Sequence, residues 1–502
     1  MARENGRLAN EGFRRCRLFV DGWLAHADAA TGLIPRNLTQ GRDIWNAQDA
    51  AADNYPFMVL TAAITDRELF AGRMLDMLRT ETRLTSRVGA MPDTYSFSRQ
   101  GFASDSVNFD GVIFGSSEYI KDGLLPLTEW LGVSPWSERM LAILDAMWAH
   151  ARVDTPYGRI VSENVEVNGE MLQVLSRVYW MTGEAKYLEW AIRLGDYYLL
   201  GERHPTKAGR LRLRDHGCEI VSGLCELYAA VHFARPEKKA AYREPIHRML
   251  DRILEVGRNE HGLFYNWVDP ATGAHDANPC DTWGYTLNGY YTVYLIDGRQ
   301  AYREATLKAL GCLNEHYRNY PWEGSSADGH ADSIESALNL YNREPMASAA
   351  EWIDHDVQVM WAIQKDDGVI EGWHGDGNFA RTTIMYCLWK TQGVTVRPWR
   401  KDVVVGAALR EDVLYLAVSA AEMWEGRLLF DKPRHRAVMK MPLDWPRINQ
   451  FPEWFTVEDG SEYAVENVDT QSSRTYSGRD MQDGIEVRLK AQETLRLKIR
   501  RD

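Results

Sequence analysis

The chain has 502 residues, of which 45% are hydrophobic and 26% are charged. This composition is typical of a globular protein and too apolar for a disordered one. The formal net charge of −13 argues against a nucleic-acid partner, because phosphates require clustered Lys and Arg. It does not oppose an oligosaccharide as the partner. No window approaches ~18 uninterrupted apolar residues, so no membrane span is expected.

The amino terminus lacks the features of a signal peptide, since MARENGRLANEGFRRC has no apolar core and no small-residue cleavage site. We therefore expect a soluble protein, cytoplasmic as the sequence stands, or periplasmic or secreted if a leader has been removed. The six cysteines form no CxxC pair and lie mostly within apolar helical runs, which predicts buried free thiols. The sequence leaves a homodimer open.

Helical periodicity extends from the amino terminus to about residue 392. Each interval between successive acidic helix starts holds two helix-length patterns, which is typical of stacked helical hairpins. Six or seven hairpins would close into an (α/α)6 or (α/α)7 toroid over residues 1–395, with the opening helix, about 6–28, packed beside the last. A straight solenoid is disfavoured because neither end shows a polar capping repeat. The starts lie near Asp49, Asp105, Glu166, Asp215, Asp281, His330 and Asp376.

The pattern changes after Trp399, where apolar residues begin to alternate with a period of two, as in the tract from Val403 to Val418. Residues 400–502 are therefore predicted to form an antiparallel β-sandwich. We expect this second domain to buttress the toroid and to carry no chemistry of its own.

In such a toroid, residues at the inner-helix starts converge on one mouth. A single Asp there is explained by helix capping, but a second acid one turn further in is not. The pairs Asp215 with Glu219, Asp332 with Glu335 and Glu166 with Glu170 are spaced to share a helix face. A buried carboxylate is costly unless it is paired or used, so these doublets are candidates for function.

Glycosidic cleavage needs one protonated acid and one carboxylate that acts as base or nucleophile. We predict Asp215 and Asp332 as this pair, followed by Glu166 and Glu219, with His216 and His330 orienting them. Trp and Tyr at the mouth offer faces on which a sugar ring could stack. An Arg there could hold a substrate carboxylate, although salt bridges to the surplus acids also explain the arginines. The predicted substrate-binding residues are Trp45, Asp53, Asn54, Asn168, Asp281, Trp283, Tyr285, Trp373, His374 and Arg381.

Two other classes of function remain open. A polysaccharide lyase would need a His or Tyr base and a group that neutralises a uronate carboxylate, for which His216, His330, His374, Tyr285 and Tyr95 are available. A non-catalytic glycan-binding scaffold is the third class. The sequence has no Walker, GxGxxG, GxSxG or HExxH motif, so neither a cofactor nor a metal is predicted.

Six tracts together resemble the bacterial polysaccharide-utilisation proteins grouped with glycoside hydrolase family 154, which is associated with β-glucuronidase activity. The resemblance spans about residues 40–395. It implies a helical toroid that removes a terminal β-linked uronic acid. From the residues alone, Arg381 is the candidate partner of the uronate carboxylate. The layout also resembles, more distantly, unsaturated glucuronyl hydrolases, in which aspartates on inner helices act. The tracts are WNAQDAAADNYPF, EVNGEMLQVLSRVY, DHGCEIVSGLCELY, CDTWGYTLNGYY, GHADSIESALNLYNREP and DGNFARTTIMYCLWKTQG.

Overall fold

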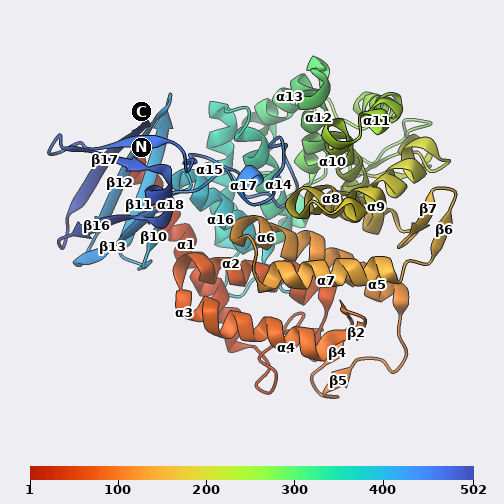
Figure 1. Ribbon diagram of the computed structural model, residues 1–502, viewed down its shortest axis with the longest axis horizontal. Coiled ribbons are helices and arrows are strands. Elements are labelled where there is room, and N and C mark those ends of the chain that lie inside the picture. Colours follow the sequence, from red (N-terminus) through yellow and green to blue (C-terminus); the bar gives the residue numbers. More distant parts are fainter.

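The computed structural model describes residues 1–502 apart from the side chain of His216. The protein is mainly helical, as predicted, and carries several antiparallel sheets (Figure 1). In the described part of the chain no helix is both long enough and apolar enough to cross a membrane. All six cysteines are buried and free, which confirms that prediction.

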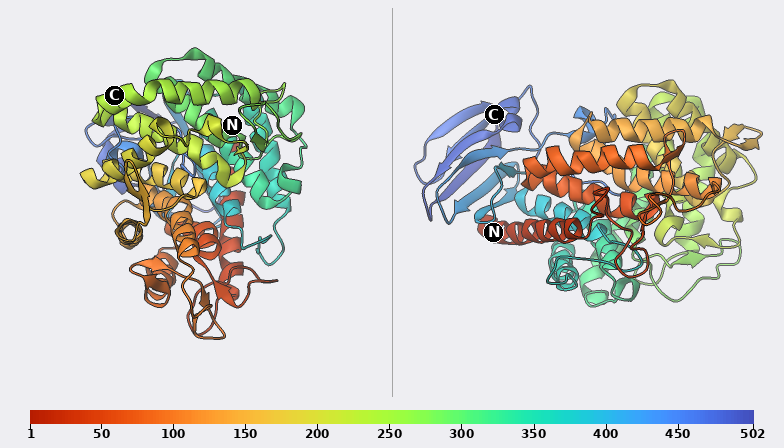
Figure 2. Two further views of the ribbon diagram at one scale, coloured as in Figure 1. Left: turned by 90° about the vertical axis from the view of Figure 1, so that its right-hand side faces the viewer. Right: turned by 90° about the horizontal axis from the view of Figure 1, so that it is seen from below.

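An inner set of helices forms a ring, because each contacts the next in chain order and α16 returns to α2 (Figures 1 and 2). These helices begin close to the acidic residues from which the sequence analysis expected them to start. The inner segments are η1 (Ala47–Asn54) with α2 (Tyr55–Thr65), α5 (Phe109–Glu118) with η3 (Tyr119–Leu124) and α6 (Leu125–Leu131), α8 (Val165–Thr182), α10 (Glu219–Ala234), α12 (Trp283–Asp297), α14 (Ala327–Tyr341) and α16 (Asn378–Thr391).

A second set of helices packs against the inner one, each outer helix contacting an inner neighbour. The opening helix α1 packs against both α16 and α2 and so lies where the ring closes, as the sequence analysis expected. The outer segments are α1 (Ala2–Ala25), α3 (Arg67–Leu69) with η2 (Phe70–Met74) and α4 (Leu75–Thr85), α7 (Pro135–Ala149), α9 (Ala185–Gly195) with η4 (Asp196–Leu200), α11 (Pro236–Val256), α13 (Gln300–His316) and α15 (Ala347–Ala362).

Short antiparallel pairs and single turns occupy the connectors before the inner helices, which build one end of the ring. The pairs are β1 (Ile44–Trp45), β4 (Tyr95–Ser96) and β5 (Gly101–Phe102); β2 (Ser86–Val88) with β3 (Met91–Pro92); β6 (Val153–Thr155) with β7 (Gly158–Ile160); and β8 (Leu211–Arg212) with β9 (Trp267–Val268). The turns are η5 (Pro205–Lys207), η6 (Asp215–Cys218) and η7 (Trp322–Gly324).

The carboxyl-terminal part contains two antiparallel sheets whose buried side chains form one hydrophobic cluster (Figure 1). The three-stranded sheet has the order β10 (Thr395–Arg397), β13 (Trp424–Leu429), β16 (Ile485–Leu489). The five-stranded sheet has the order β11 (Val403–Arg410), β12 (Val413–Ala420), β17 (Thr494–Arg501), β14 (Glu462–Asn467), β15 (Ser473–Ser477). The short helices α17 (Arg434–Ala437) and α18 (Gly478–Asp483) complete this part.

The larger sheet docks on the amino-terminal end of α1 through a glycine contact. A Cβ atom on Gly406 would lie 2.1 Å from the backbone nitrogen of Gly6 and 2.2 Å from the carbonyl oxygen of Ala2. We expect Gly406→Ala to reduce the free energy of unfolding by about 1–3 kcal/mol, because the backbones must separate. Urea denaturation measures this. Gly460→Ala is the control, since nothing lies near its added methyl group, and equal midpoints for both variants would contradict the docking contact.

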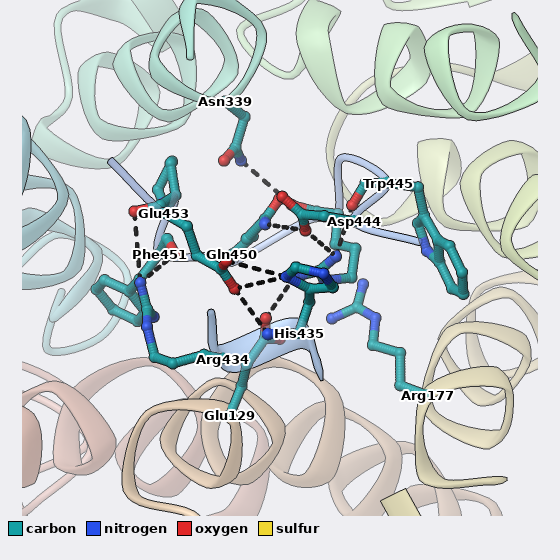
Figure 3. Close-up of polar contacts among 12 residues, drawn as sticks. Glu129, Arg177, Asn339, Arg434, His435, Asp444, Trp445, Gln450, Phe451 and Glu453 are labelled. Atoms are coloured by element: carbon teal, nitrogen blue, oxygen red, sulfur yellow. Dashed lines mark hydrogen bonds and ion pairs between the residues drawn. The ribbon is translucent and has the colours of Figure 1, made fainter. Parts of the chain in front are cut away.

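One segment of the carboxyl-terminal part lies outside the two sheets and packs against the helical ring. Residues 434–455, here called the inserted segment, run against the helical ring, and Met439, Met441, Trp445 and Phe451 belong to the hydrophobic core of the ring. Figure 3 shows polar side chains of this segment between the ring helices. The sequence analysis did not predict that the tail contributes to the helical core.

Candidate active site

A cavity of about 740 Å³ opens where the inner helices begin. Its walls combine side chains from most of the ring with one residue of the inserted segment, Asn449. Ring closure therefore brings together residues that are far apart in the sequence. The polar lining residues are Arg36, Gln48, Asp49, Asp53, Glu118, Lys121, Asp122, Asp215, Glu219, Thr282, Tyr285, Glu323, Ser325, Ser326, Asp328, Asp332, Lys365, Glu371, His374, Asp376, Asn378, Arg381 and Asn449.

The cavity is strongly acidic. Eleven Asp and Glu side chains line it, against four Lys and Arg side chains and His374. Each of the four cations is already paired with an acid of the same wall, so their charge is offset within the protein. The pairs are Arg36 with Asp49 (2.6 Å), Lys121 with Asp122 (2.7 Å), Lys365 with Glu371 (3.2 Å) and Arg381 with Asp332 (2.7 Å).

Asp332 is held by two donors on one of its oxygens. The Tyr285 hydroxyl donates to Oδ1 over 2.8 Å, and the Arg381 guanidinium donates to the same atom over 2.7 Å. Neither donor contacts Oδ2, and Asp332 lines the cavity. Two donors on one oxygen fix the direction of the side chain. The geometry thus presents a fixed carboxylate oxygen to the cavity.

Behind Asp332, a buried network anchors Arg381. Its Nε lies 2.9 Å from Glu335 Oε2, and its Nη1 donates to the side-chain oxygens of Asn378 (2.8 Å) and Asn449 (2.9 Å). Burial raises the pKa of Glu335 to about 7 against the opposing charge of Arg381. Arg381 is therefore a structural cation of the wall, and a substrate carboxylate would have to displace Asp332 or Glu335 to reach it.

A second buried network surrounds Lys121 on the neighbouring wall. Its ammonium lies 2.7 Å from Asp122 and 2.5 Å from Glu219. Burial alone would lower the pKa of Lys121, but the carboxylates of Asp122, Glu219 and Glu170 outweigh it and raise the pKa well above its usual value. Lys121 therefore stays charged and is unsuited to act as a base.

Asp215 lies at the cavity wall with a strained backbone. Its φ of 52° lies in the left-handed region, which residues other than Gly rarely adopt. Its backbone N–H donates to Thr282 Oγ1 (3.0 Å), and its carboxylate accepts from Arg212 (2.5 Å). Strain of this kind concentrates at functional sites, where the surrounding structure maintains it.

Two further carboxyl groups of the cavity favour the protonated form. Burial, together with the charges of Asp332 and Asp376, raises the pKa of Asp328 well above its usual value. Burial raises the pKa of Asp376 to about 6, opposed by His374 and assisted by Asp332. For His374, the carboxylates of Asp53, Asp49 and Asp376 outweigh burial and raise the pKa. The cavity thus combines two carboxyl groups whose pKa values are raised with an Asp332 side chain whose direction is fixed.

Asp281 lies outside the cavity lining, and its raised pKa predicts how the free energy of unfolding depends on pH. Burial, followed by the charges of Asp332 and Glu323, raises its pKa to about 7 against the opposing charge of Arg214. Because this value exceeds the unfolded one, the contribution to stability is complete below the unfolded pKa and is lost as the pH rises to about 7.

We therefore expect Asp281→Asn to flatten the decline of unfolding free energy between pH 5 and 7 by about 1.4 kcal/mol per pH unit, the value for one proton. Denaturant titrations at several pH values measure the slope. Asp105→Asn, at an exposed acid of the connector before α5, serves as the control. An Asp281→Asn slope equal to the wild-type slope would contradict the prediction.

The cavity gathers half of the sixteen predicted site residues. Asp215, Glu219 and Asp332 line it, as do Asp53, Tyr285, Trp373, His374 and Arg381. Trp373 is 71% exposed, with the Arg36 guanidinium 4.8 Å from its ring centre, so it is the aromatic face available at the mouth. His216 lies outside the described residues.

Several predicted roles need correction, because the side chains lie elsewhere. Trp45 and Trp283 are buried in the core and cannot stack on a sugar, and the Trp283 indole donates to Ser333 (3.0 Å). The helical periodicity that identified these positions does not separate a core face from a lining face. The other predicted residues outside the lining are Glu166, His330 (paired with Asp356, 3.0 Å), Asn54, Asn168 (bonded to Tyr198, 3.0 Å) and Asp281.

The sequence analysis missed part of the site. Lys121 and Asp122 lie inside an apolar run, FGSSEYIKDGLL, where a buried charge is costly unless it is paired; that cost was the available signal. Arg36 and Glu323 come from connectors, and Asn449 comes from the tail. No spacing rule points to these three residues, because only the folded chain brings them to the cavity.

Three groups of side chains could each offer three ligand atoms to a metal ion, the atoms lying within 4.8 Å of one another. Only the group of Asp49, Asp53 and His374 lies wholly in the cavity lining. In this group His374 Nε2 is 3.7 Å from Asp53 Oδ2, an arrangement that an ion pair explains. None of the three includes His330. The groups are Asp49, Asp53 and His374; His435, Asp444 and Glu453; and Glu118, Glu166 and Glu170.

No family model and no curated protein matches this chain. Solved structures give distant matches. A family 76 glycoside hydrolase from a bovine Bacteroides thetaiotaomicron strain has 13% identity and a TM-score of 0.42, covering 57% of this chain and 71% of that chain. The α-1,6-mannanase GH76A of Salegentibacter has 10% identity and a TM-score of 0.42, covering 75% and 97%. A possible family 105 member from Salmonella enterica has 13% identity and a TM-score of 0.40, covering 55% and 81%. Scores this low identify no activity for this chain.

Proposed function

We propose that this protein is a glycoside hydrolase that removes a terminal sugar from an oligosaccharide by carboxylate acid and base catalysis. The observation that supports the proposal is the cavity itself, where Asp332 is fixed by Arg381 and Tyr285 beside the proton-bearing Asp328. In the same proposal, the helical ring is a closed toroid of (α/α) hairpins and the two tail sheets form a β-sandwich.

Asp332 and Asp215 are the proposed catalytic pair, as the sequence analysis chose them, because both line the cavity from separate elements. Asp328 is a third candidate, since its raised pKa suits a proton donor at neutral pH. A general acid protonates the leaving oxygen, whereas a base activates water or a nucleophile attacks the sugar carbon. Each role therefore predicts a different dependence of a variant's hydrolysis rate on the leaving group.

The experiment compares Asp215→Asn, Asp328→Asn and Asp332→Asn on aryl glycosides with good and poor leaving groups. Loss of the general acid lowers the rate mainly for poor leaving groups, whereas loss of the base or nucleophile lowers it for both. If the wild-type protein hydrolyses none of a broad set of α- and β-glycosides and oligosaccharides, the proposal is wrong.

The identity of the sugar is the finer part of the proposal. The resemblance to family 154 implies a terminal β-linked uronic acid, but the eleven acids and the paired state of Arg381 favour a neutral sugar. Parallel assays of aryl β-glucuronide, β-glucoside and α-mannoside decide between them. Faster turnover of the glucuronide would show that an acidic group does reach Arg381 or Arg36.

A uronate lyase has less support from the cavity. The Tyr285 hydroxyl lies 2.8 Å from Asp332 Oδ1 and 2.9 Å from Glu335 Oε2, so carboxyl groups of the wall already engage its single proton. Burial raises its pKa well above the usual value, which disfavours a phenolate base. His374 lies among carboxylates that raise its pKa, which also makes it a poor base. Ultraviolet absorbance of an unsaturated product separates the two functions, since only a lyase generates it.

A further inference from the structure

The inserted segment enters the ring from the end opposite the helix starts. Its partners lie in the later halves of the inner helices. Asn339 donates to the carbonyl of Arg447 (3.2 Å), Arg177 donates to the carbonyl of Ile448 (3.4 Å), and Glu226 accepts from the Trp445 indole (3.0 Å). Figure 3 shows Asn339, Arg177 and Trp445 around this segment. The cavity is lined from the first halves of two of these helices, by Glu219 of α10 and by Asp328 and Asp332 of α14.

Asn449 is the residue of this segment that reaches the cavity. Its side-chain Nδ2 donates to Asp122 Oδ1 (2.6 Å), and its Oδ1 accepts from Arg381 (2.9 Å). Its backbone N–H donates to Glu335 Oε1 (2.6 Å). One residue therefore joins the Lys121 network to the Arg381 network, which hold different walls of the cavity.

The backbone at Asn449 fits this position. Its φ of 60° lies in the left-handed region, which Asn tolerates better than most residues. This conformation directs both the backbone N–H and the side-chain amide at ring residues. The side chain is almost completely buried, so its amide has no solvent to bond if these partners are lost, and the three contacts fix one another.

We propose that the inserted segment is the floor of the cavity and that Asn449 is a positioning residue for the catalytic carboxylates. Asn449 holds Arg381, and Arg381 in turn fixes Asp332. The closed floor makes the cavity a blind pocket, which admits the end of a glycan and excludes its interior. The carboxyl-terminal part is thus required for activity. The kinetic part of this inference rests on the proposed function.

The kinetic test uses Asn449→Gly, which keeps the left-handed backbone and the bond to Glu335 but removes both side-chain bonds. We expect kcat to fall by about 10- to 100-fold, with KM changed by less than about 3-fold. Gln450→Ala is the matched control. It is equally buried and bonded to Asp444 (3.0 Å) and Arg343 (3.1 Å), but does not line the cavity.

A third variant, Asn449→Asp, separates positioning from general stability. When the new carboxyl is protonated it can still donate to Asp122 and accept from Arg381; when ionised it repels Asp122. We expect its kcat, relative to wild type, to recover as the pH falls. Equal kcat losses in Asn449→Gly and Gln450→Ala, with parallel pH profiles for all variants, would overturn the positioning role.

A labelling test is independent of activity. The native cysteines are all buried, so Asn449→Cys and Gln450→Cys can be compared for reaction with methyl methanethiosulfonate. We expect the first thiol to react at least about 10-fold faster, because position 449 borders the cavity and position 450 does not. Equal rates, or no reaction at either position, would overturn the proposal that the inserted segment is the floor of the cavity. If the wild type hydrolyses no glycoside but this difference is seen, the proposed function fails and the floor stands.

Discussion

Replacing Asp332 by Asn is expected to lower kcat by about 10²- to 10⁴-fold, the range measured for general acid and base groups. The amide keeps the shape of the side chain but removes the charge that both Arg381 and Tyr285 face. Because Glu335 still pairs with Arg381 (2.9 Å), the wall keeps its principal ion pair, so the loss falls on chemistry more than on folding.

The measurement is the initial rate on the best aryl glycoside, with thermal denaturation of each variant alongside. Asp354→Asn is the matched control, since Asp354 also pairs with a cation, Lys390 (2.6 Å), and with the Tyr386 hydroxyl (2.8 Å), but lies on the outer helix α15. We expect that control to keep wild-type kcat. An Asp332→Asn variant with more than about a tenth of wild-type kcat would remove Asp332 from the chemistry.

The sequence predicted the helical class and the helix starts because each inner helix has an acidic residue at or shortly before its start and alternates with an outer partner. The same argument selected Asp215, Glu219 and Asp332, which do meet in one cavity. Convergence of helix starts is a property of the ring topology, so it can be inferred before any contact is known.

The argument failed where topology says nothing about direction. Trp283 and Trp373 both occupy helix-start tracts, yet one is fully buried and the other is 71% exposed. Trp283 is the first residue of α12, whereas Trp373 lies in the connector before α16, and the sequence pattern alone does not place these boundaries or fix the direction of either side chain. Asn449 could not be inferred at all, because its contacts join residues more than 60 positions apart in the chain.

The acidic composition of the chain takes on a local meaning in the structure. The cavity concentrates negative charge that its own cations only partly offset. Burial is the main cause of the raised pKa values of Asp328 and Asp376, and the charge of Asp332 adds to it in both cases. Under the proposed function, the same acidic wall would disfavour an anionic substrate and would hold the proton that glycosidic cleavage needs.

The largest stability loss is expected from Arg447→Met, in the inserted segment. Arg447 is fully buried, pairs with Glu129 and bonds to Asp444 over 2.8 Å. Burial alone would raise the pKa of Glu129, but Arg447 and Arg177 lower it, so Glu129 is charged in the folded protein. Removing Arg447 leaves that charge buried without its principal partner, and breaking such a pair costs about 3–5 kcal/mol.

Urea denaturation of the single variant and of Arg447→Met/Glu129→Leu separates two causes. The double variant is expected to regain most of the loss, because replacing both partners by apolar side chains removes the uncompensated charge. Arg488→Met, whose Arg488–Glu425 pair is exposed, should change stability by less than about 0.5 kcal/mol. If the single variant loses less than about 1 kcal/mol, or the double variant regains nothing, the ion pair does not fasten the floor to the ring.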